Sequence, residues 1–304
     1  MLNKIVKVKF VDDIIGKKAV KEINNLKEGE VLLLENIRNL NDEMNPSANN
    51  LIVKTLAPLF DIFINDAFSV SHRMQTSVVS FPRFLDSGIG RTMQRELESL
   101  EKLRVKGALF ILGGAKPEED MLLLKKKRKI LATGAFALLC LIVRNYDLGA
   151  QGKKLKKEFK EFRKLRALSK NVTMPVDFAF NINGKRKDFS LENFSADYEA
   201  LDIGDETIKL FIREIKKAHV ILMKGPPGKF EDKRFAKGTR ELLRAIANSK
   251  AFSVLGGGHT SSALEKFHIN KNRFDYVSLA GGAFLTYLAG EKLPGLEVLE
   301  RWKK

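Results

Sequence analysis

Short apolar runs alternate with longer amphipathic segments along this chain. Seven runs have the length and the enrichment in β-branched and aromatic residues that are typical of strands. These runs span residues 31–35, 61–65, 108–112, 175–180, 219–223, 252–255 and 276–280. Between them, apolar positions recur at helical spacing in residues 47–59, 92–103, 205–217, 234–248 and 261–267. Apolar strands that alternate with helices predict parallel sheets covered on both faces, which is a doubly wound (Rossmann-like) α/β fold.

The length of the chain and the order of these segments predict two domains. A chain of 304 residues is long for one domain. We find three convincing strands before Gly88, whereas a doubly wound sheet usually has about five or six, so the first domain is expected to be incomplete. The expected divisions are an N-terminal domain at 1–90, a hinge helix at 91–104, a C-terminal domain at 105–280 and a tail at 281–304 that returns to the N-terminal domain.

The chain is strongly basic, with 54 Lys and Arg residues against 37 Asp and Glu residues and a formal net charge of +17. Such a charge favours anionic partners, namely phosphorylated metabolites, nucleic acid or an acidic membrane surface. The single cysteine, Cys140, cannot form an internal disulfide, which is typical of a reducing compartment. The longest apolar run, 130–143, is too short to span a membrane, and the first residues lack the apolar stretch of a signal peptide. We therefore expect a soluble, cytoplasmic protein.

Two basic segments, 125–129 and 153–170, raise the alternative of nucleic-acid or membrane-surface binding. The second segment carries apolar residues at helical spacing, so a solvated helix face that packs its apolar stripe on a sheet explains it more simply. The segments are accompanied by no zinc-ligand spacing, recognition-helix motif or aromatic RNA-binding platform. The sequence therefore favours a phosphorylated small molecule as the anionic partner.

Three glycine-rich loops follow predicted strands, at 112–116 (LGGAK), 224–228 (KGPPG) and 256–260 (GGGHT). Ligands of parallel α/β sheets bind outside the carboxyl ends of the strands, where glycines let backbone amides approach an anion. Each loop taken alone is as well explained by a tight turn. Three of them at strand ends predict a phosphate-binding edge, although none matches the Walker or the dinucleotide pattern.

Read together, these loops and several further motifs resemble the phosphoglycerate kinase family. The resemblance is carried by LLLENIR (32–38), NDAFSVSHRMQTSVVSF (65–81), LGGAK, PVDFAF (175–180), MKGPPGKFEDKRFAKGT (223–239) and GGGHT. The motifs occur in the family's order from one end of the chain to the other. A histidine at position 259, where aspartate is common, resembles the archaeal branch of the family.

The resemblance implies a two-lobed phosphotransferase with a carboxyl group as acceptor. Such an enzyme moves a phosphoryl group between 1,3-bisphosphoglycerate and ADP, giving 3-phosphoglycerate and ATP, with Mg²⁺ as cofactor. One lobe holds the triose and the other holds the nucleotide, and closure of a hinge brings them together. This chemistry requires positioning and charge stabilisation rather than a side-chain nucleophile.

The resemblance also implies roles for single residues. Arg38 and Arg73 would bind the phosphate and carboxylate of the triose, with His72 beside them. Lys116 would lie along the nucleotide phosphates, and Glu231 would accept hydrogen bonds from the ribose. No metal ligand is assigned. The remaining nucleotide-binding positions that the resemblance implies are Gly113, Gly114, Gly256, Gly257, Gly258, His259 and Thr260.

The sequence departs from the family pattern in two ways. The opening βα units, with their R-x-D-x-N-x-P and H-L-G-R-P motifs, are not found, which predicts an exposed sheet edge and either self-association or complementation by a separately supplied piece. Asp120 stands at a position usual for lysine, and Lys224 stands at one usual for asparagine, so we hypothesise that Lys224 restores the positive charge lost at position 120.

Three functions remain open at this point. The first is an active phosphoglycerate kinase, and the second is a catalytically impaired remnant that binds only ADP or ATP. The third is a basic nucleic-acid-binding or scaffold protein that kept the fold, since a fold alone does not determine an activity.

Overall fold

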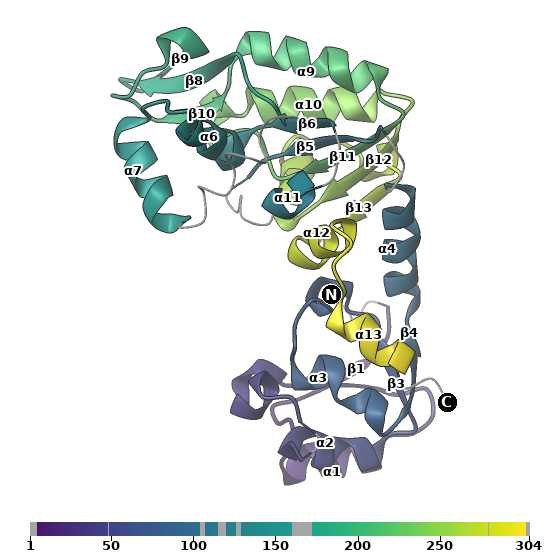
Figure 1. The fold of residues 1–304 in the computed structure, drawn as a ribbon. Coiled ribbons are helices and arrows are strands. Elements are labelled where there is room, and N and C mark those ends of the chain that lie inside the picture. The colour runs from purple at the N-terminus through teal and green to yellow at the C-terminus, as the bar shows by residue number, and fades with distance from the viewer. Residues whose placement is uncertain are drawn as a thin grey trace. The chain divides into compact units, whose positions relative to one another are not determined.

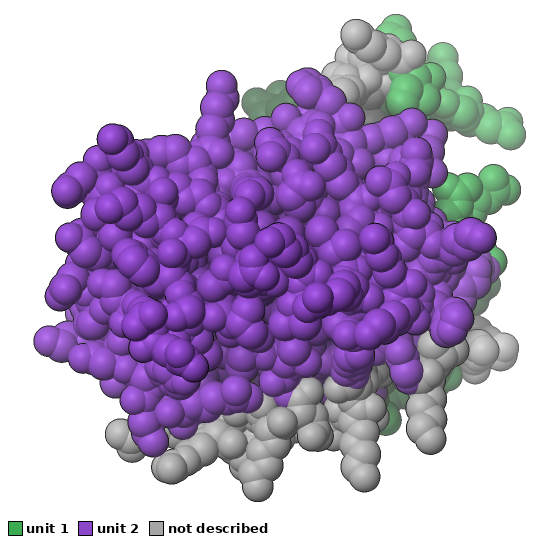
Figure 2. Space-filling view, turned by 90° about the horizontal axis from the view of Figure 1, so that it is seen from above, with its two compact units in different colours: residues 1–95, 292–304 green, residues 96–291 purple. Residues whose placement is uncertain are grey.

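The computed structural model describes residues 5–47, 49–103, 107–114, 120–125, 129–159, 172–278 and 280–301. The chain divides into two compact units, coloured separately in Figure 2. Unit 1 comprises residues 1–95 and 292–304, and unit 2 comprises residues 96–291. Helix α4 (Arg91–Lys102) carries the chain from one unit into the other.

Unit 1 contains two separate parallel sheets of two strands each. Strands β1 and β2 pair from Val8↔Val31, and strands β3 and β4 pair from Ile62↔Asp86. The strands are β1 (Val8–Val11), β2 (Val31–Leu34), β3 (Ile62–Asn65) and β4 (Asp86–Ile89), and the helices are α1 (Lys17–Asn24), α2 (Leu51–Leu56), α3 (Thr76–Val79) and α13 (Pro294–Arg301).

The core of unit 1 is small and lies between its helices and the inner faces of its strands. Ile52, Val53 and Leu56 of α2 are buried against Ile23 of α1 and Phe81. The outer positions of the strands are uncovered, and they include Phe10, Leu33, Ile62 and Ile64. Parallel strands are usually covered on both faces, so this unit presents apolar strand surface to solvent.

The C-terminal helix belongs to unit 1. The backbone N–H of Gly295, in α13, donates to the carbonyl of Ser71 over 2.9 Å. The side-chain amide of Asn65, the last residue of β3, donates to the carbonyl of Gly295 over 3.4 Å. The chain thus returns to its first unit after passing through the second.

Unit 2 contains a six-stranded parallel sheet in the order β13-β12-β11-β5-β6-β7 (Figure 1). Its members are β5 (Leu109–Leu112), β6 (Lys129–Ala132), β7 (Val172–Thr173), β11 (Val220–Lys224), β12 (Phe252–Gly256) and β13 (Tyr276–Ser278). After α4, the α-helices that the structure describes in this unit are α6 (Gly134–Val143), α7 (Gly149–Glu158), α9 (Asp205–Lys217), α10 (Lys237–Ala247), α11 (Gly258–Lys266) and α12 (Gly282–Leu288).

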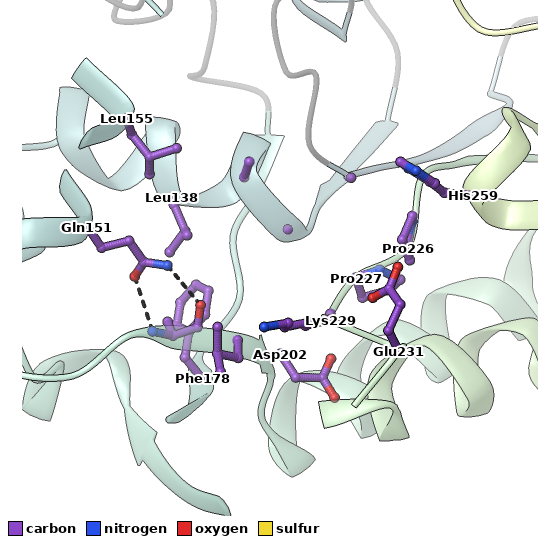
Figure 3. A pocket seen from close by; sticks show the side chains of 16 residues that line it. Leu138, Gln151, Leu155, Phe178, Asp202, Pro226, Pro227, Lys229, Glu231 and His259 are labelled. Atoms are coloured by element: carbon purple, nitrogen blue, oxygen red, sulfur yellow. Dashed lines mark hydrogen bonds between the residues drawn. The ribbon is translucent and has the colours of Figure 1, made fainter. Parts of the chain in front are cut away.

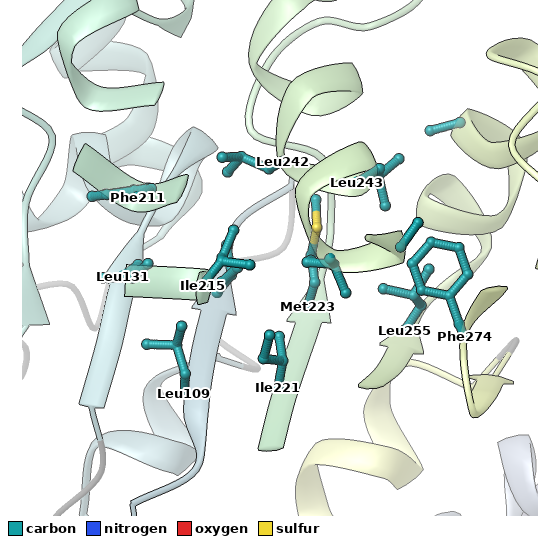
Figure 4. Close-up of a cluster of buried hydrophobic side chains, with 14 of the residues drawn as sticks. Leu109, Leu131, Phe211, Ile215, Ile221, Met223, Leu242, Leu243, Leu255 and Phe274 are labelled. Carbon is teal, nitrogen blue, oxygen red and sulfur yellow. The ribbon is translucent and has the colours of Figure 1, made fainter. Parts of the chain in front are cut away.

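The central apolar run of each strand explains why this sheet is buried. One face packs Leu109, Ile221 and Met223 against Phe211 of α9 and Leu242 of α10 (Figure 4). Side chains of a strand alternate between the two faces, so the neighbours of these residues point to the opposite side. The α/β fold class predicted from the sequence is confirmed.

One predicted strand belongs to a different sheet. Residues 175–180 were expected within the parallel arrangement, but β8 (Asp177–Ile182) lies in an antiparallel three-stranded sheet with β9 (Lys185–Ser190) and β10 (Ala200–Ile203). The cause is the tight turn between β8 and β9, where Asn183 has φ +48° and Gly184 has φ +79°. Two consecutive positive φ values are typical of a two-residue hairpin loop, which reverses the chain direction.

Among the described residues, no helix is both long and apolar enough to cross a membrane.

Candidate functional site

The carboxyl ends of five strands of unit 2, β5, β6, β11, β12 and β13, meet at one edge of the parallel sheet. The registers pair Leu112 with Ala132, Lys224 with Leu112, and Gly256 with both Lys224 and Ser278. The glycine-rich loops at 112–116, 224–228 and 256–260 all begin at these positions. Their described residues therefore lie at the same edge, as the sequence predicted.

Two of these turns cross in direct backbone contact. The N–H of Gly113 donates to the carbonyl of Lys224 over 2.9 Å, and the N–H of Gly114 donates to that of Pro226 over 3.1 Å. A Cβ on Gly225, whose φ is +77°, would lie 2.3 Å from the carbonyl oxygen of Gly113. Only glycine permits this approach, so the crossing explains why the two turns carry glycine at their contact.

The third turn starts helix α11 and is tied to its neighbours. Thr260 Oγ1 accepts from the N–H of Gly225 over 3.0 Å and donates to the carbonyl of Gly256 over 2.9 Å. The N–H of Gly257 donates to the carbonyl of Ser278 over 3.1 Å. A Cβ on Gly257 or Gly258 would have no atom within 4 Å, so open space adjoins the start of this nine-residue helix. Unpaired N–H groups at a helix start favour a bound anion.

A cavity of about 330 Å³ opens beside these turns (Figure 3). This volume is at the lower end of ordinary small-molecule sites. Three of the nucleotide positions that the resemblance implies, Gly114, Glu231 and His259, line it. The apolar part of the wall consists of Ala135, Leu138, Leu155, Phe178, Ala200, Leu201, Pro226 and Pro227.

Gln151 fixes one wall of the cavity. Its side-chain amide donates to the carbonyl of Ala200 over 3.0 Å, and its side-chain oxygen accepts from the N–H of Ala200 over 3.1 Å. The pair of bonds joins helix α7 to strand β10, as Figure 3 shows. The sequence reasoning did not single out Gln151, because its partner lies 49 positions away.

Asp202 contributes a buried carboxyl group to the cavity wall. Its Oδ2 accepts from Arg186 Nη1 over 2.8 Å and from the N–H of Gly238 over 2.9 Å. Burial raises the pKa of Asp202 to about 6, while the bonds from Gly238 and Arg186 act in the opposite direction. The sequence reasoning did not single out Asp202 either, although it opens the Asp-Ile-Gly segment at 202–204.

A buried ion pair lies at the end of strand β11. Lys224 Nζ is 3.0 Å from Asp120 Oδ1, and the side chains are 8% and 0% exposed. Lys224 ends strand β11 and Asp120 lies 104 positions earlier in the chain, so the sequence showed the two charges but not their contact.

Unit 1 holds the three residues expected to bind the triose. Arg38 follows β2 and is exposed, and its N–H donates to Asn36 Oδ1 over 3.1 Å. His72 and Arg73 follow β3 and are half-buried. The N–H of Arg73 donates to the carbonyl of Val70 over 2.9 Å, which forms the turn that carries the pair. All three thus follow carboxyl ends of strands, in two different sheets.

One expected residue cannot be placed. Lys116 lies outside the described residues, as do parts of the two basic segments, at 126–128 and 160–170. Among the described residues, no group of three or more His, Cys, Asp and Glu side chains could hold a metal ion.

A parallel sheet with glycine turns and a cavity at its carboxyl edge is the arrangement of nucleotide-binding α/β proteins. The chain belongs to the phosphoglycerate kinase family, since the family model with that description matches residues 1–291. The resemblance seen in the sequence is thereby confirmed.

Curated relatives support the same assignment. The phosphoglycerate kinase of Methanothermus fervidus is 37% identical over 318 residues, which cover 98% of this chain and 77% of the relative. That of Archaeoglobus fulgidus is 38% identical over 319 residues, which cover 98% of this chain and 78% of the relative. Both organisms are archaea, in keeping with the archaeal character expected from His259.

Solved structures agree with these sequences. The crystal structure of phosphoglycerate kinase from Pyrococcus horikoshii matches with a TM-score of 0.88 at 32% identity, covering 97% of this chain and 78% of that one. The enzyme from Coxiella burnetii matches with a TM-score of 0.78 at 28% identity, covering 100% of this chain and 79% of that one. The likeness therefore extends over both units.

Proposed function

We propose that the chain is a phosphoglycerate kinase, which transfers a phosphoryl group reversibly between 1,3-bisphosphoglycerate and ADP. The observation that carries the proposal is the edge of the parallel sheet in unit 2, where three glycine turns and a largely apolar cavity meet in a member of this family. In the reaction towards ADP, a β-phosphate oxygen of ADP forms a bond to the phosphorus of the acyl phosphate. The bond from that phosphorus to the carboxyl oxygen breaks, which leaves 3-phosphoglycerate and ATP.

The nucleotide is proposed to bind in unit 2. The apolar wall of the cavity suits the base, and Glu231, which lines the same cavity, is proposed to accept hydrogen bonds from the ribose hydroxyl groups. The phosphates would then run over the turns, where backbone N–H groups and the start of α11 favour negative charge. The residues proposed for this contact are Gly113, Gly114, Lys116, Gly256, Gly257, Gly258, His259 and Thr260.

The triose is proposed to bind in unit 1, through Arg38 and Arg73 with His72 beside them. A guanidinium group presents donors in a planar fork that matches a carboxylate or phosphate, and it stays charged at every physiological pH. The acceptor and the transferred group both carry negative charge, so cationic forks offset their repulsion. This chain's residues thus bind, orient and exclude water, which is the main requirement of phosphoryl transfer.

Magnesium is proposed to arrive as part of the nucleotide substrate. The described residues offer no cluster of metal ligands, whereas Mg²⁺ in kinases commonly binds phosphate oxygens, waters and only one or two carboxylates. Imidazole suits transition metals better than Mg²⁺, so His259 is not proposed as its ligand. MgADP and MgATP are therefore written as the substrates.

The proposal is tested by calorimetry with MgADP and by a coupled assay with MgATP and 3-phosphoglycerate. The wild-type chain should bind MgADP and turn over 3-phosphoglycerate. Arg73→Gln should abolish most of the turnover and leave the affinity for MgADP unchanged, because the two ligands bind in different units. Arg91→Gln removes an exposed arginine outside the proposed site and is the matched control. Absence of heat with millimolar MgADP would overturn the proposal.

We further propose that the open strands of unit 1 pair with additional strands, from a second copy or from a separately supplied polypeptide. Ile62 and Ile64 of β3 are 59% and 49% exposed, and each two-stranded sheet leaves strand edges without a neighbour among the described residues. Exposed apolar edges readily accept another strand. Sedimentation velocity over a range of concentrations should show association that Ile64→Lys weakens. A single monomeric species at every concentration would contradict self-association.

The location of the enzyme is proposed to be the cytoplasm. The single thiol, Cys140, is buried and unpaired with another cysteine, in keeping with a reducing compartment. Cell fractionation with an antibody to the chain tests this, and recovery in a membrane or secreted fraction would contradict it.

A further inference from the structure

The ion pair between Lys224 and Asp120 stands at a distinctive place in unit 2. Lys224 is the last residue of β11, and its register partners are Leu112 and Gly256, the last residues of the two flanking strands. Its side chain therefore leaves the sheet at the edge where the glycine turns begin. Met223 packs on the face covered by α9 and α10, so by alternation Lys224 points to the opposite face.

Contacts on both sides tie Lys224 to the third glycine turn. A Cβ on Gly256 would lie 3.7 Å from Lys224 Cγ, so the aliphatic stem passes directly beside this turn. The next residue, Gly225, donates its N–H to Thr260 Oγ1 in the first turn of α11. These contacts link the position of the Lys224 side chain to the third glycine turn, beside which open space lies.

Stability alone is a weak reason for this pair. Moving a carboxylate and an ammonium group out of water costs several kcal/mol for each, and an apolar pair of similar volume is often as stable or more so. The strand end is otherwise lined by apolar side chains, such as Leu112 and the ring of Phe284. A Cβ added at Gly256 would lie 3.5 Å from this ring. The pair therefore points to a role for the cation at this edge.

We propose that Lys224 binds the transferring phosphoryl group and that Asp120 is a positioning residue for its ammonium group. An ammonium group has three donors, so Nζ can keep its bond to Asp120 and donate to a phosphoryl oxygen as well. The inference rests on the proposed function, because it needs the polyphosphate to lie over the third glycine turn. It adds a residue of the reaction that is distinct from the cavity wall, which Lys224 does not line.

The chemistry assigns the cation to one part of the reaction. Negative charge builds up on the oxygens of the transferring group as one bond to phosphorus breaks and the other forms. A buried ammonium group stabilises this charge more than an exposed one, because the surrounding dielectric is low. Lys224 takes up no proton and forms no covalent bond in this step. Asp120 keeps the ammonium group oriented while the site is empty.

The test compares the affinities of the two nucleotides, because only MgATP carries the transferring group. Lys224→Met keeps the stem and removes the charge, and Asp120→Asn/Lys224→Met removes both charges, so that no carboxylate is left buried alone. Loss of one charge-assisted hydrogen bond should lower the affinity for MgATP by about 10-fold to 100-fold, with little change in the affinity for MgADP. Turnover at saturating substrates should fall as well, and Lys224→Arg should restore part of it.

Asp120→Asn alone separates positioning from charge. It leaves the ammonium group in place but less well oriented, so the affinity for MgATP should fall by less than in Lys224→Met. The double variant should bind MgATP no more weakly than Lys224→Met, since the effects of substituting two residues that act as a unit are not additive. Lys217→Met, which removes an exposed lysine at the end of α9, is the matched control and should leave the ratio of the two affinities unchanged.

The possible results distinguish the two levels of the argument. If the wild-type chain binds neither nucleotide, the proposed function fails and this inference fails with it. Suppose instead that the wild type binds both nucleotides, and that the double variant lowers the affinities for MgATP and MgADP equally or lowers neither. The inference alone is then wrong, and the ion pair is structural. A selective loss of MgATP affinity in the double variant supports the assignment even if the single variant does not fold.

Discussion

Arg186 Nη1 lies 2.8 Å from Asp202 Oδ2, and this contact joins strand β9 to the wall of the cavity in unit 2. The arginine also binds Asp188, so one guanidinium group connects β9 and β10. Burial nevertheless raises the pKa of Asp202 to about 6, because the side chain is fully enclosed. The carboxyl group that helps to shape the cavity therefore titrates near neutral pH.

The stability of the chain should respond to this titration. An unfolded aspartate has a pKa of 3.8, so between pH 3.8 and about 6 the folded chain holds a proton that the unfolded chain has lost. The free energy of unfolding consequently falls as the pH rises through this window, by about 3 kcal/mol from this group. Asp202→Asn should remove the effect. Urea unfolding at pH 4.5, 5.5 and 7 measures it, and parallel profiles for wild type and variant would contradict it. Asp188→Asn removes another acidic partner of Arg186 and is the control, since it should leave the pH dependence due to Asp202 in place.

A second buried acid lies on the helix that connects the units. Ser278 Oγ donates to Glu96 Oε1 over 2.9 Å, and burial raises the pKa of Glu96 against the opposing hydrogen bonds from Ser278 and Tyr276. The folded chain thus favours the protonated acid, and its stability falls as the pH rises above 4.5, the usual value for glutamate. Glu96→Gln keeps the acceptor without the charge. Its melting temperature relative to the wild type should therefore rise from pH 4.5 to pH 8.

A melting temperature difference that stays constant over this range would show that Glu96 does not titrate in folding. Glu98→Gln changes an acid two positions along the same helix and serves as the control. The bond between Ser278 and Glu96 matters for the site because the carbonyl of Ser278 accepts from the N–H of Gly257, the second residue of the third glycine turn.

The parts of the structure that the sequence predicted well are encoded locally. Strands β11 (VILMK) and β12 (FSVLG) are largely apolar and lead directly into glycine turns, and both features lie within a few residues of each other. The antiparallel sheet was missed although its signal, Asn183-Gly184, is equally local. That dipeptide between two strand-like segments predicts a hairpin, and only the first of the two segments was recognised as a strand.

The parts of the site that were missed depend on contacts between distant positions. Lys224 and Asp120 are 104 positions apart, and Gln151 and Ala200 are 49 positions apart. Pattern and spacing show which residues are charged or polar, but the pairing follows from the order of strands in the sheet. A buried ion pair at a strand end therefore becomes visible only when the fold is known.

The single cysteine should be chemically inert in the folded chain. Cys140 lies in α6, where seven neighbouring residues of the helix are also buried, and burial raises the pKa of its thiol to about 12. Thiolate is the reactive form, so very little is present at pH 8. Ellman's reagent should modify Cys140 only after unfolding in guanidinium chloride. Cys140→Ser should destabilise the chain by about 1–3 kcal/mol, since it buries a hydroxyl group among apolar side chains, and Cys140→Ala should cost less. Rapid modification of the native chain would contradict this prediction.

Adjacent glycines at the start of α11 allow backbone strain and ligand contact to be separated. Gly257 has φ +91°, which side chains rarely adopt, whereas Gly258 is the first residue of the helix and no positive φ is found there. Gly257→Ala should therefore lower the free energy of unfolding by about 1–2 kcal/mol. Gly258→Ala should leave it unchanged or raise it by up to about 1 kcal/mol, because alanine favours the helix.

The affinity for MgADP should follow a different pattern. The methyl group of Gly258→Ala projects into the open space beside the turn, which is where the phosphates are proposed to lie. This variant should be fully folded in urea titrations and yet bind MgADP about 10-fold more weakly, as expected when backbone N–H groups lose close contact with an anion. If a stable Gly258→Ala chain binds MgADP as tightly as the wild type, the phosphates do not rest on the third glycine turn. The nucleotide would then have to lie along the first two turns alone, which would leave His259 and Thr260 of the third turn without a part in binding its phosphates.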